Sequence, residues 1–250
     1  MFRLTTLLTV LFVAWTSSGQ AAQDSVQHML KAADAYRLTD DAMQVETQIT
    51  IMKDGTPDKE RRYTVYLREN RQSLVVMRSP SERGQKVLML ADDFWLIMPS
   101  TQRPMRITPT QKLFGDASTG DIATMTWAGD YDGKVVAEEA CVEGAKERCV
   151  HLSLNSQRKG VTYTRIELWL AKGGYQPVRA DLFVASDKMA KQASFRLDGV
   201  EGRQQVTEML LTDQIQQGKQ TVVRYLSRLA KRAPDDWFNP MFLTRNELGS

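Results

Sequence analysis

Hydrophobic side chains alternate with polar ones from residue 43 onward. Val45, Thr47, Ile49 and Ile51 occupy every second position, with polar residues between them. Because successive side chains of a strand point to opposite faces of a sheet, this period of two predicts a half-buried strand. Similar runs follow, separated by Gly, Asp, Asn and Pro residues that favour turns. The further strands are predicted at residues 63–67, 72–78, 86–90, 94–98, 105–108, 134–142, 148–154, 161–170, 177–184, 191–197, 205–212 and 220–227.

This succession of strands indicates an antiparallel meander. Most runs follow one another without an intervening helical pattern, which argues against alternating βαβ units. Roughly eleven to thirteen strands exceed the eight whose own side chains just fill a closed barrel. We therefore predict a mainly β fold with a few helices. The curved sheet encloses space that a helix, a ligand or both must occupy.

One long helix is predicted at residues 24–38, before the first strand. Val26, Met29, Leu30 and Ala33 recur at the spacing of one helical face, and Asp24 is placed to cap the start. An apolar stripe of this kind fits either a lid over the sheet or a packing helix. The pattern does not separate the two.

Two other segments interrupt the strand pattern. Residues 110–131 form a connection long enough to cover the sheet, and a short helix is predicted within it at 121–127. Residues 235–243 are rich in aromatic side chains, and we expect them to dock as a short turn against the sheet. No low-complexity linker or internal repeat divides the rest of the chain.

Residues 1–21 have the pattern of a cleaved secretory signal peptide. Arg3 gives a positive start, an uncharged apolar run follows, and Gly19 and Ala21 are small residues at the expected cleavage site. The alternative is a membrane anchor, but the apolar run of about 12 residues is shorter than the ~20 needed to span hydrocarbon. We expect residues 22–250 to form one domain of the mature protein.

Cys141 and Cys149 lie on either side of a predicted hairpin turn centred on Ala145. That centre places the two cysteines opposite each other, where cross-strand Cβ atoms are close enough to bridge. A redox or metal role favours a CxxC spacing or several nearby histidines, which this segment lacks. We predict a structural disulfide, as an oxidising compartment allows.

The composition and the motifs exclude several classes of function without identifying one. The 33 basic and 30 acidic residues are interspersed, and no basic stripe indicates nucleic-acid binding. The sequence contains no nucleophile elbow, phosphate-binding glycine loop or zinc-protease motif. We predict no enzymatic activity, no metal and no cofactor. The mature chain retains eleven of the 12 methionines, which suit an adaptable cavity or an irregular core equally well.

Two stretches resemble a known family. They are DDFWLIMPSTQRPMRI at residues 92–107 and LFGDASTGDIATMTWAGDY at residues 113–131. Together with the signal peptide, the early helix and the aromatic tail, they are similar to the LolA-like family of periplasmic lipoprotein-sorting proteins. The chain resembles a broader branch of that family more than the prototype carrier.

The resemblance implies an incomplete antiparallel β-barrel, covered by the N-terminal helix and a lid, with an apolar cavity for acyl chains. It implies a periplasmic carrier of lipoproteins or related lipids. The implied partners are an inner-membrane exporter of the ABC or RND type and an outer-membrane acceptor. The alternative is a non-carrying adaptor of an RND-type exporter. In either case we expect a monomer.

The resemblance also selects candidate ligand-binding residues. Arg106 is either a latch that hydrogen-bonds to the lid or a solvated strand residue. The apolar candidates serve either ligand contact or plain core packing. They are Trp95, Ile97 and Met98 on a strand, and Leu113, Phe114, Ile122, Met125 and Trp127 in the lid.

Overall fold

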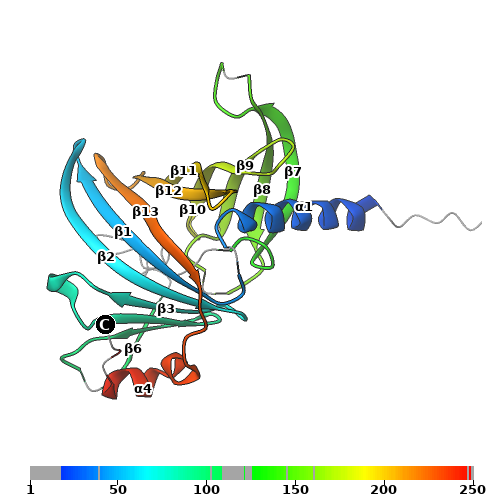
Figure 1. The fold of residues 1–250 in the computed structure, drawn as a ribbon. Helices are drawn as coiled ribbons and strands as arrows, with labels where there is room; N and C mark the ends of the chain where they lie inside the picture. Colours follow the sequence, from blue (N-terminus) through cyan, green and yellow to red (C-terminus); the bar gives the residue numbers. More distant parts are fainter. Residues whose placement is uncertain are drawn as a thin grey trace, which may run out of the picture.

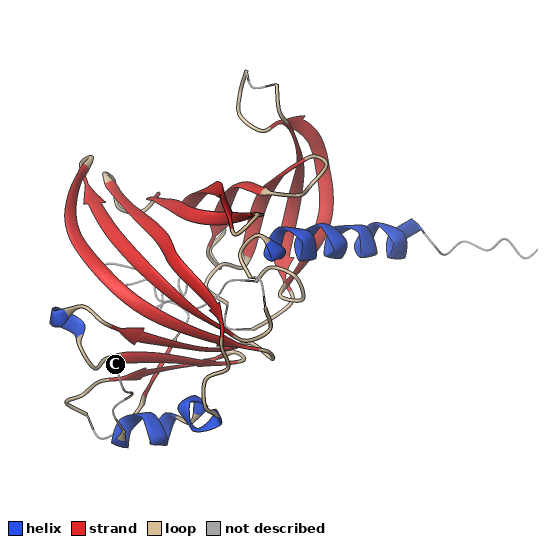
Figure 2. Ribbon diagram, viewed as in Figure 1, coloured by secondary structure: helices blue, strands red, loops and turns tan. Residues whose placement is uncertain are grey.

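The computed structural model describes residues 18–38, 40–101, 103–108, 121, 126–144, 146–159, 161–246 and 248. Strands dominate this part of the chain, and thirteen of them form one curved antiparallel sheet (Figures 1 and 2). The predicted fold class, mainly β with an incompletely closed sheet, is confirmed. The strands are β1 (Met43–Lys53), β2 (Thr56–Arg68), β3 (Gln72–Met77), β4 (Lys86–Leu90), β5 (Asp93–Ile97), β6 (Met105–Ile107), β7 (Tyr131–Ala140), β8 (Arg148–Ser156), β9 (Arg165–Ala171), β10 (Pro177–Phe183), β11 (Met189–Val200), β12 (Arg203–Asp213) and β13 (Lys219–Ala230).

The order of strands explains how the sheet stays open. Consecutive strands pair with each other at every step but one, and β1 also pairs with β13, which joins the two ends of the meander. The remaining pair of consecutive strands, β6 and β7, forms the two free edges. The 110–131 connection therefore links one edge of the sheet to the other.

The sheet has an inner face that packs against the first helix. On β1 every second residue is buried, from Met43 to Ile51, as the alternation predicts. The helix α1 (Ser18–Ala35) supplies Val26, Leu30 and Ala33 to the same core, and it lies beside β7 (Figure 1). The predicted apolar stripe is therefore the buried face of α1.

The bounds of α1 differ from the predicted 24–38. The helix begins at Ser18, so Asp24 lies inside it rather than at its cap, and it ends at Ala35. Periodicity in the apolar stripe gave no information on the polar residues before Val26. The predicted cleavage site after Ala21 falls within the described helix.

The outer face of β2–β5 packs against the C-terminal segment. This segment comprises η2 (Asp235–Phe238) and α4 (Pro240–Arg245), which lie at the other end of the sheet from α1 (Figure 2). Phe238 and Leu243 are buried there, which confirms the predicted docking of the aromatic tail. Strands β3, β4 and β5 are consequently covered on both faces.

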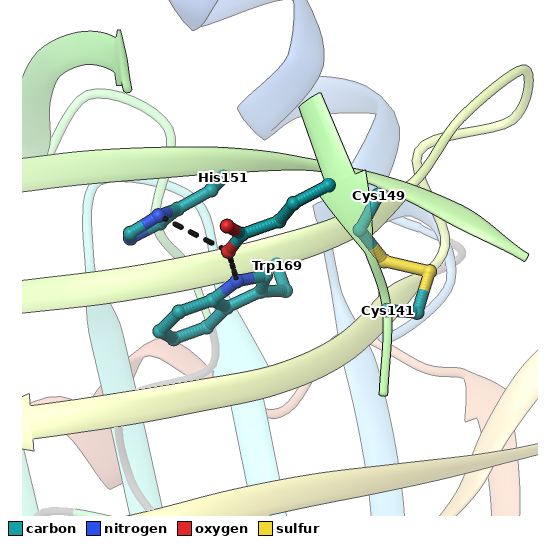
Figure 3. Close-up of a disulfide and its surroundings, with 5 residues drawn as sticks. Cys141, Cys149, His151 and Trp169 are labelled. Atoms are coloured by element: carbon teal, nitrogen blue, oxygen red, sulfur yellow. Dashed lines mark hydrogen bonds and ion pairs between the residues drawn. A yellow bond between two sulfur atoms is a disulfide. The ribbon is translucent and has the colours of Figure 1, made fainter. Parts of the chain in front are cut away.

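The predicted disulfide is present between Cys141 and Cys149, with a Cα–Cα distance of 4.8 Å (Figure 3). The predicted register is wrong by two residues, since Cys149 pairs with Glu139 rather than with Cys141. A shift of two keeps both cysteines on the same face of the hairpin, so their side chains still meet. Trp169 packs against the bridge from β9.

Replacing both cysteines with alanine should lower the free energy of unfolding by about 2–3 kcal/mol, the entropy of closing a short loop in the chain-entropy model. Urea denaturation of the double variant and of wild type would measure the difference. Reduced wild type is the control and should match the variant. A double variant as stable as oxidised wild type would contradict this account.

Candidate functional site

The inner face of the sheet encloses a cavity of about 70 Å³. Apolar side chains of β9–β12 form much of its wall, including Ile166, Leu182, Phe195 and Met209. This volume holds only a few water molecules and lies below the ~300–1,000 Å³ typical of ligand pockets. A ligand that needs a pocket of ~300–1,000 Å³ can therefore enter only if the residues that cover the cavity move.

A pair of alanines contributes to the hollow. Ala180 on β10 lies directly opposite Ala193 on β11, and both line the cavity. Their neighbours across the next strands are the larger Leu168 and Leu211. Because neither alanine carries a side chain beyond Cβ, the inner face recedes at this point of the sheet.

Residues 126–131 cover the cavity, and α1 holds them there. Both carboxylate oxygens of Asp34 accept from the Trp127 N–H, at 3.0 and 2.9 Å, and one of them also accepts from Ala128. About two turns earlier in α1, Gln27 donates to the Tyr131 carbonyl at 2.7 Å and accepts from the Gly129 N–H. We call residues 126–131 the cover segment. Two polar side chains of α1 thus bind the backbone of the cover segment.

Trp127 is the largest side chain of the cover segment, with 6% of its surface exposed. Its ring meets Phe195 of β11 edge to face, at 5.7 Å between centroids. The guanidinium of Arg37, just after α1, lies 4.2 Å from the centre of the Trp127 ring. Arg37 also lines the cavity and is itself 5% exposed. A cation and two aromatic rings thus close one side of the cavity.

A polar network lies at another side of the cavity. Asp121 accepts from the Tyr163 hydroxyl at 2.7 Å and forms an ion pair with Lys191. The Tyr131 hydroxyl donates to the Tyr163 carbonyl at 2.8 Å. Burial raises the pKa of both tyrosines above their ordinary value, so both hydroxyls remain protonated donors. The cavity wall is therefore amphiphilic rather than uniformly apolar.

A second hollow of about 550 Å³ adjoins the cavity and shares Arg71, Thr126 and Asp130 with it. Asp130 is buried and forms ion pairs with Arg71 and, at 3.3 Å, with Arg158. The C-terminal end of α1 and the turn between β2 and β3 supply most of its other walls. This outer cleft, unlike the inner cavity, has a volume in the range of ligand pockets.

Asp34 should make stability depend on pH. Burial raises the pKa of its carboxyl from 3.8 to about 6, although Arg37 and the backbone N–H groups oppose the rise. The folded chain therefore binds this proton more tightly than the unfolded chain. Stability contributed by Asp34 falls as pH rises from about 4 to about 6, by about 3 kcal/mol at ~1.36 kcal/mol per pKa unit.

Denaturation of wild type and of the variant Asp34→Asn at several pH values would isolate this effect. The asparagine keeps one acceptor oxygen for the cover segment but does not titrate. The difference in unfolding free energy between the two proteins should change across pH 4–6 in the stated direction. A difference that stays constant over this range would contradict the raised pKa.

The ligand-binding residues predicted from the sequence lie in different parts of the structure. Trp127 lines the cavity, and its contact with a ligand stays a prediction. Trp95 and Ile97 instead belong to the outer-face cluster that packs against the C-terminal segment, and Met98 follows the end of β5. The β5 residue that lines the cavity is Phe94. Leu113, Phe114, Ile122 and Met125 lie outside the described residues.

Arg106 lies on the edge strand β6 with its side chain largely exposed. It forms an ion pair with Asp93 of β5, and its guanidinium lies 5.8 Å from the Trp95 ring centre. Among the described residues its partners thus belong to the neighbouring strand. The observed contacts fit an edge-strand residue, whereas the cover segment is held by Asp34 and Gln27.

The sequence prediction missed Gln27, Asp34 and Arg37. A signal for the first two was present, since they are seven residues apart and therefore share a helical face beside the apolar stripe. Arg37 gave no local signal, because its partners Trp127 and Phe195 are distant in sequence.

The described residues lack two further features. They include no group of three or more His, Cys, Asp or Glu side chains suited to holding a metal ion. No helix among them combines the length and hydrophobicity needed to cross a membrane.

Comparisons with known proteins agree on the type of fold. A family model with the description "-like: Uncharacterized protein" matches residues 69–245. The structure is similar to that of a LolA superfamily protein from Nitrosomonas europaea, with a TM-score of 0.77 and 29% identity. That match covers 85% of this chain and 96% of the other. No curated protein sequence matches the chain.

Two more distant structures share the fold. A putative outer membrane lipoprotein-sorting protein domain from Vibrio parahaemolyticus has a TM-score of 0.71 and 17% identity, covering 91% of this chain and all of the other. A DUF1329 family protein from Desulfovibrio piger has a TM-score of 0.69 and 23% identity, covering 87% and 97%. At these identities the likeness concerns the fold alone.

Proposed function

This chain belongs to the LolA-like family, and on that basis we propose that it is a periplasmic carrier of acyl chains. The cargo would be a lipoprotein or a related lipid that moves toward the outer membrane. The observation that carries the proposal is the cavity on the inner face, closed by the cover segment, whose backbone is hydrogen-bonded to side chains of α1.

The energetics of lipid transfer favour such a cavity. Exposing a 16-carbon chain to water costs roughly 12 kcal/mol at about 0.8 kcal/mol per methylene. A carrier must therefore shield the chain throughout its passage. The apolar wall of β9–β12 provides a surface for this purpose once the cover segment moves away.

Release requires no chemical energy from the carrier itself. A ligand moves to whichever protein binds it more tightly, and a carrier needs only to lie between its donor and its acceptor in affinity. We propose an inner-membrane exporter as the donor and an outer-membrane protein as the acceptor. In this scheme residues 1–21 direct the chain to the periplasm and are removed, residues 22–250 act as one unit, and no catalytic step is involved.

Native mass spectrometry of the processed protein, purified from periplasm without detergent, tests the proposal. We expect a fraction of the molecules to carry added mass equal to one lipid or lipoprotein acyl group. Mild denaturation should release that mass. Recovery of the protein without any lipid, but cross-linked to an exporter, would instead support a non-carrying adaptor and contradict the carrier.

A further inference from the structure

Arg37 is a buried guanidinium, and two of its three nitrogens lack a hydrogen-bond partner among the described residues. Among the described residues, no acceptor pairs with its Nε or Nη1, although both atoms are shielded from solvent. Its side chain is 6% exposed and contributes to the cavity wall. Buried guanidinium groups are normally hydrogen-bonded, because an unpaired buried charge is strongly unfavourable.

The nearest carboxylate does not satisfy Arg37. Asp34 lies 4.0 Å from Nη1, at the outer limit of an ion pair, and its oxygens instead accept from the backbone of Trp127 and Ala128. The guanidinium carbon lies over the Trp127 ring, 4.2 Å from its centre, where the positive charge is attracted to the ring face. Among the residues that the structure describes, Nε and Nη1 of this side chain therefore have no hydrogen-bond acceptor.

The other charged groups around the cavity are engaged with one another. Asp121 pairs with Lys191, and Asp130 pairs with both Arg71 and Arg158. Their charges are accounted for within the structure. Arg37 differs from them because it lacks a close carboxylate among the described residues and borders the apolar wall.

We propose that Arg37 binds the anionic head group, a carboxylate or a phosphate, of a lipid whose acyl chain lies along the β9–β12 wall. A carboxylate or phosphate oxygen can accept a charge-assisted hydrogen bond from a free nitrogen of a guanidinium. This inference rests on the proposed carrier function and specifies its substrate class. The carrier would then prefer acidic lipids to neutral acyl esters.

Calorimetric titration of the delipidated protein with three probes of equal chain length tests the proposal. The probes are palmitate, hexadecyl phosphate and hexadecanol. We expect both anions to bind roughly 10-fold to 100-fold more tightly than the alcohol, the range typical of a hydrogen bond to a charged group. Equal affinity for all three would overturn the role of Arg37, while leaving the carrier function intact.

The variant Arg37→Gln should lose this preference and keep its affinity for hexadecanol. Arg37→Lys keeps the charge and should retain part of the preference, which a purely structural role for the residue would not produce. Arg179→Gln is the matched control, since Arg179 lies 3.8 Å from the centre of the outward-facing Trp169 ring. This control should behave as wild type.

Two outcomes separate this inference from its premise. If none of the three probes binds, both the carrier function and the head-group site are wrong. Inorganic phosphate alone should not displace palmitate, because it buries no apolar surface. Displacement by phosphate would assign the site to a free anion and overturn the proposal for a lipid.

Discussion

Replacing Ala193 with phenylalanine is expected to abolish lipid binding. Ala193 faces Ala180 across the β10–β11 pair, where the inner face recedes to form the cavity. A phenyl group would occupy that space before any acyl chain could. Overpacking should lower the free energy of unfolding by about 1–3 kcal/mol. A domain whose unfolding free energy is ~5–15 kcal/mol tolerates this loss.

The measurement is the fraction of protein that carries lipid after detergent-free purification, together with palmitate affinity. Ala180→Leu places a smaller obstruction on the neighbouring strand and should lower binding partially. Ala137→Phe, on the edge strand β7, is the control and should bind as wild type. If Ala193→Phe folds and still carries the wild-type amount of lipid, the ligand lies elsewhere.

The variant Trp127→Ala is expected to lose much of its stability and to be stabilised strongly by a bound lipid. The side chain is nearly fully buried between Phe195 and Arg37, so its removal should cost about 3–5 kcal/mol of unfolding free energy. It also enlarges the cavity at the point where the cover segment closes it. A lipid that fills this space should therefore stabilise the variant more than it stabilises wild type.

Trp169→Ala gives a matched comparison. Trp169 is buried to a similar extent, with 7% exposed, and also packs under an arginine, but it belongs to the outer face beside the disulfide (Figure 3). Both variants should lose stability, and only Trp127→Ala should show the enlarged increase in melting temperature with palmitate. Equal increases in the two variants would contradict a covering role for Trp127.

The strands of the sheet could be predicted because the alternation of apolar and polar residues is a pattern of neighbouring positions in the sequence. The alternation on β1 places apolar residues on one face, and the turn residues between strands mark where each one ends. The bounds were less certain where turns carried apolar residues, as before β9, which begins at Arg165 rather than at residue 161. The disulfide pairing was also predictable, since a two-residue error in register leaves the cysteines on one face.

The candidate site was harder to predict because burial on both faces removes the alternation. Strand β5 is apolar from Phe94 to Ile97, with Phe94 directed to the inner core and Trp95 and Ile97 to the C-terminal segment. Nothing in a continuous apolar run indicates which face is inner. Arg37 was missed for a different reason, since its environment is built by residues about 90 and 160 positions away.

The most direct test of a lipid-binding interior is photo-cross-linking with palmitate that carries a diazirine near its methyl end. After irradiation of the delipidated, reloaded protein, peptide mapping would locate the attached chain. We predict labelling of cavity residues on β11 and β12, such as Phe195 and Met209. Label confined to the outer cluster around Trp95 and Trp237, or no label above background, would contradict the account.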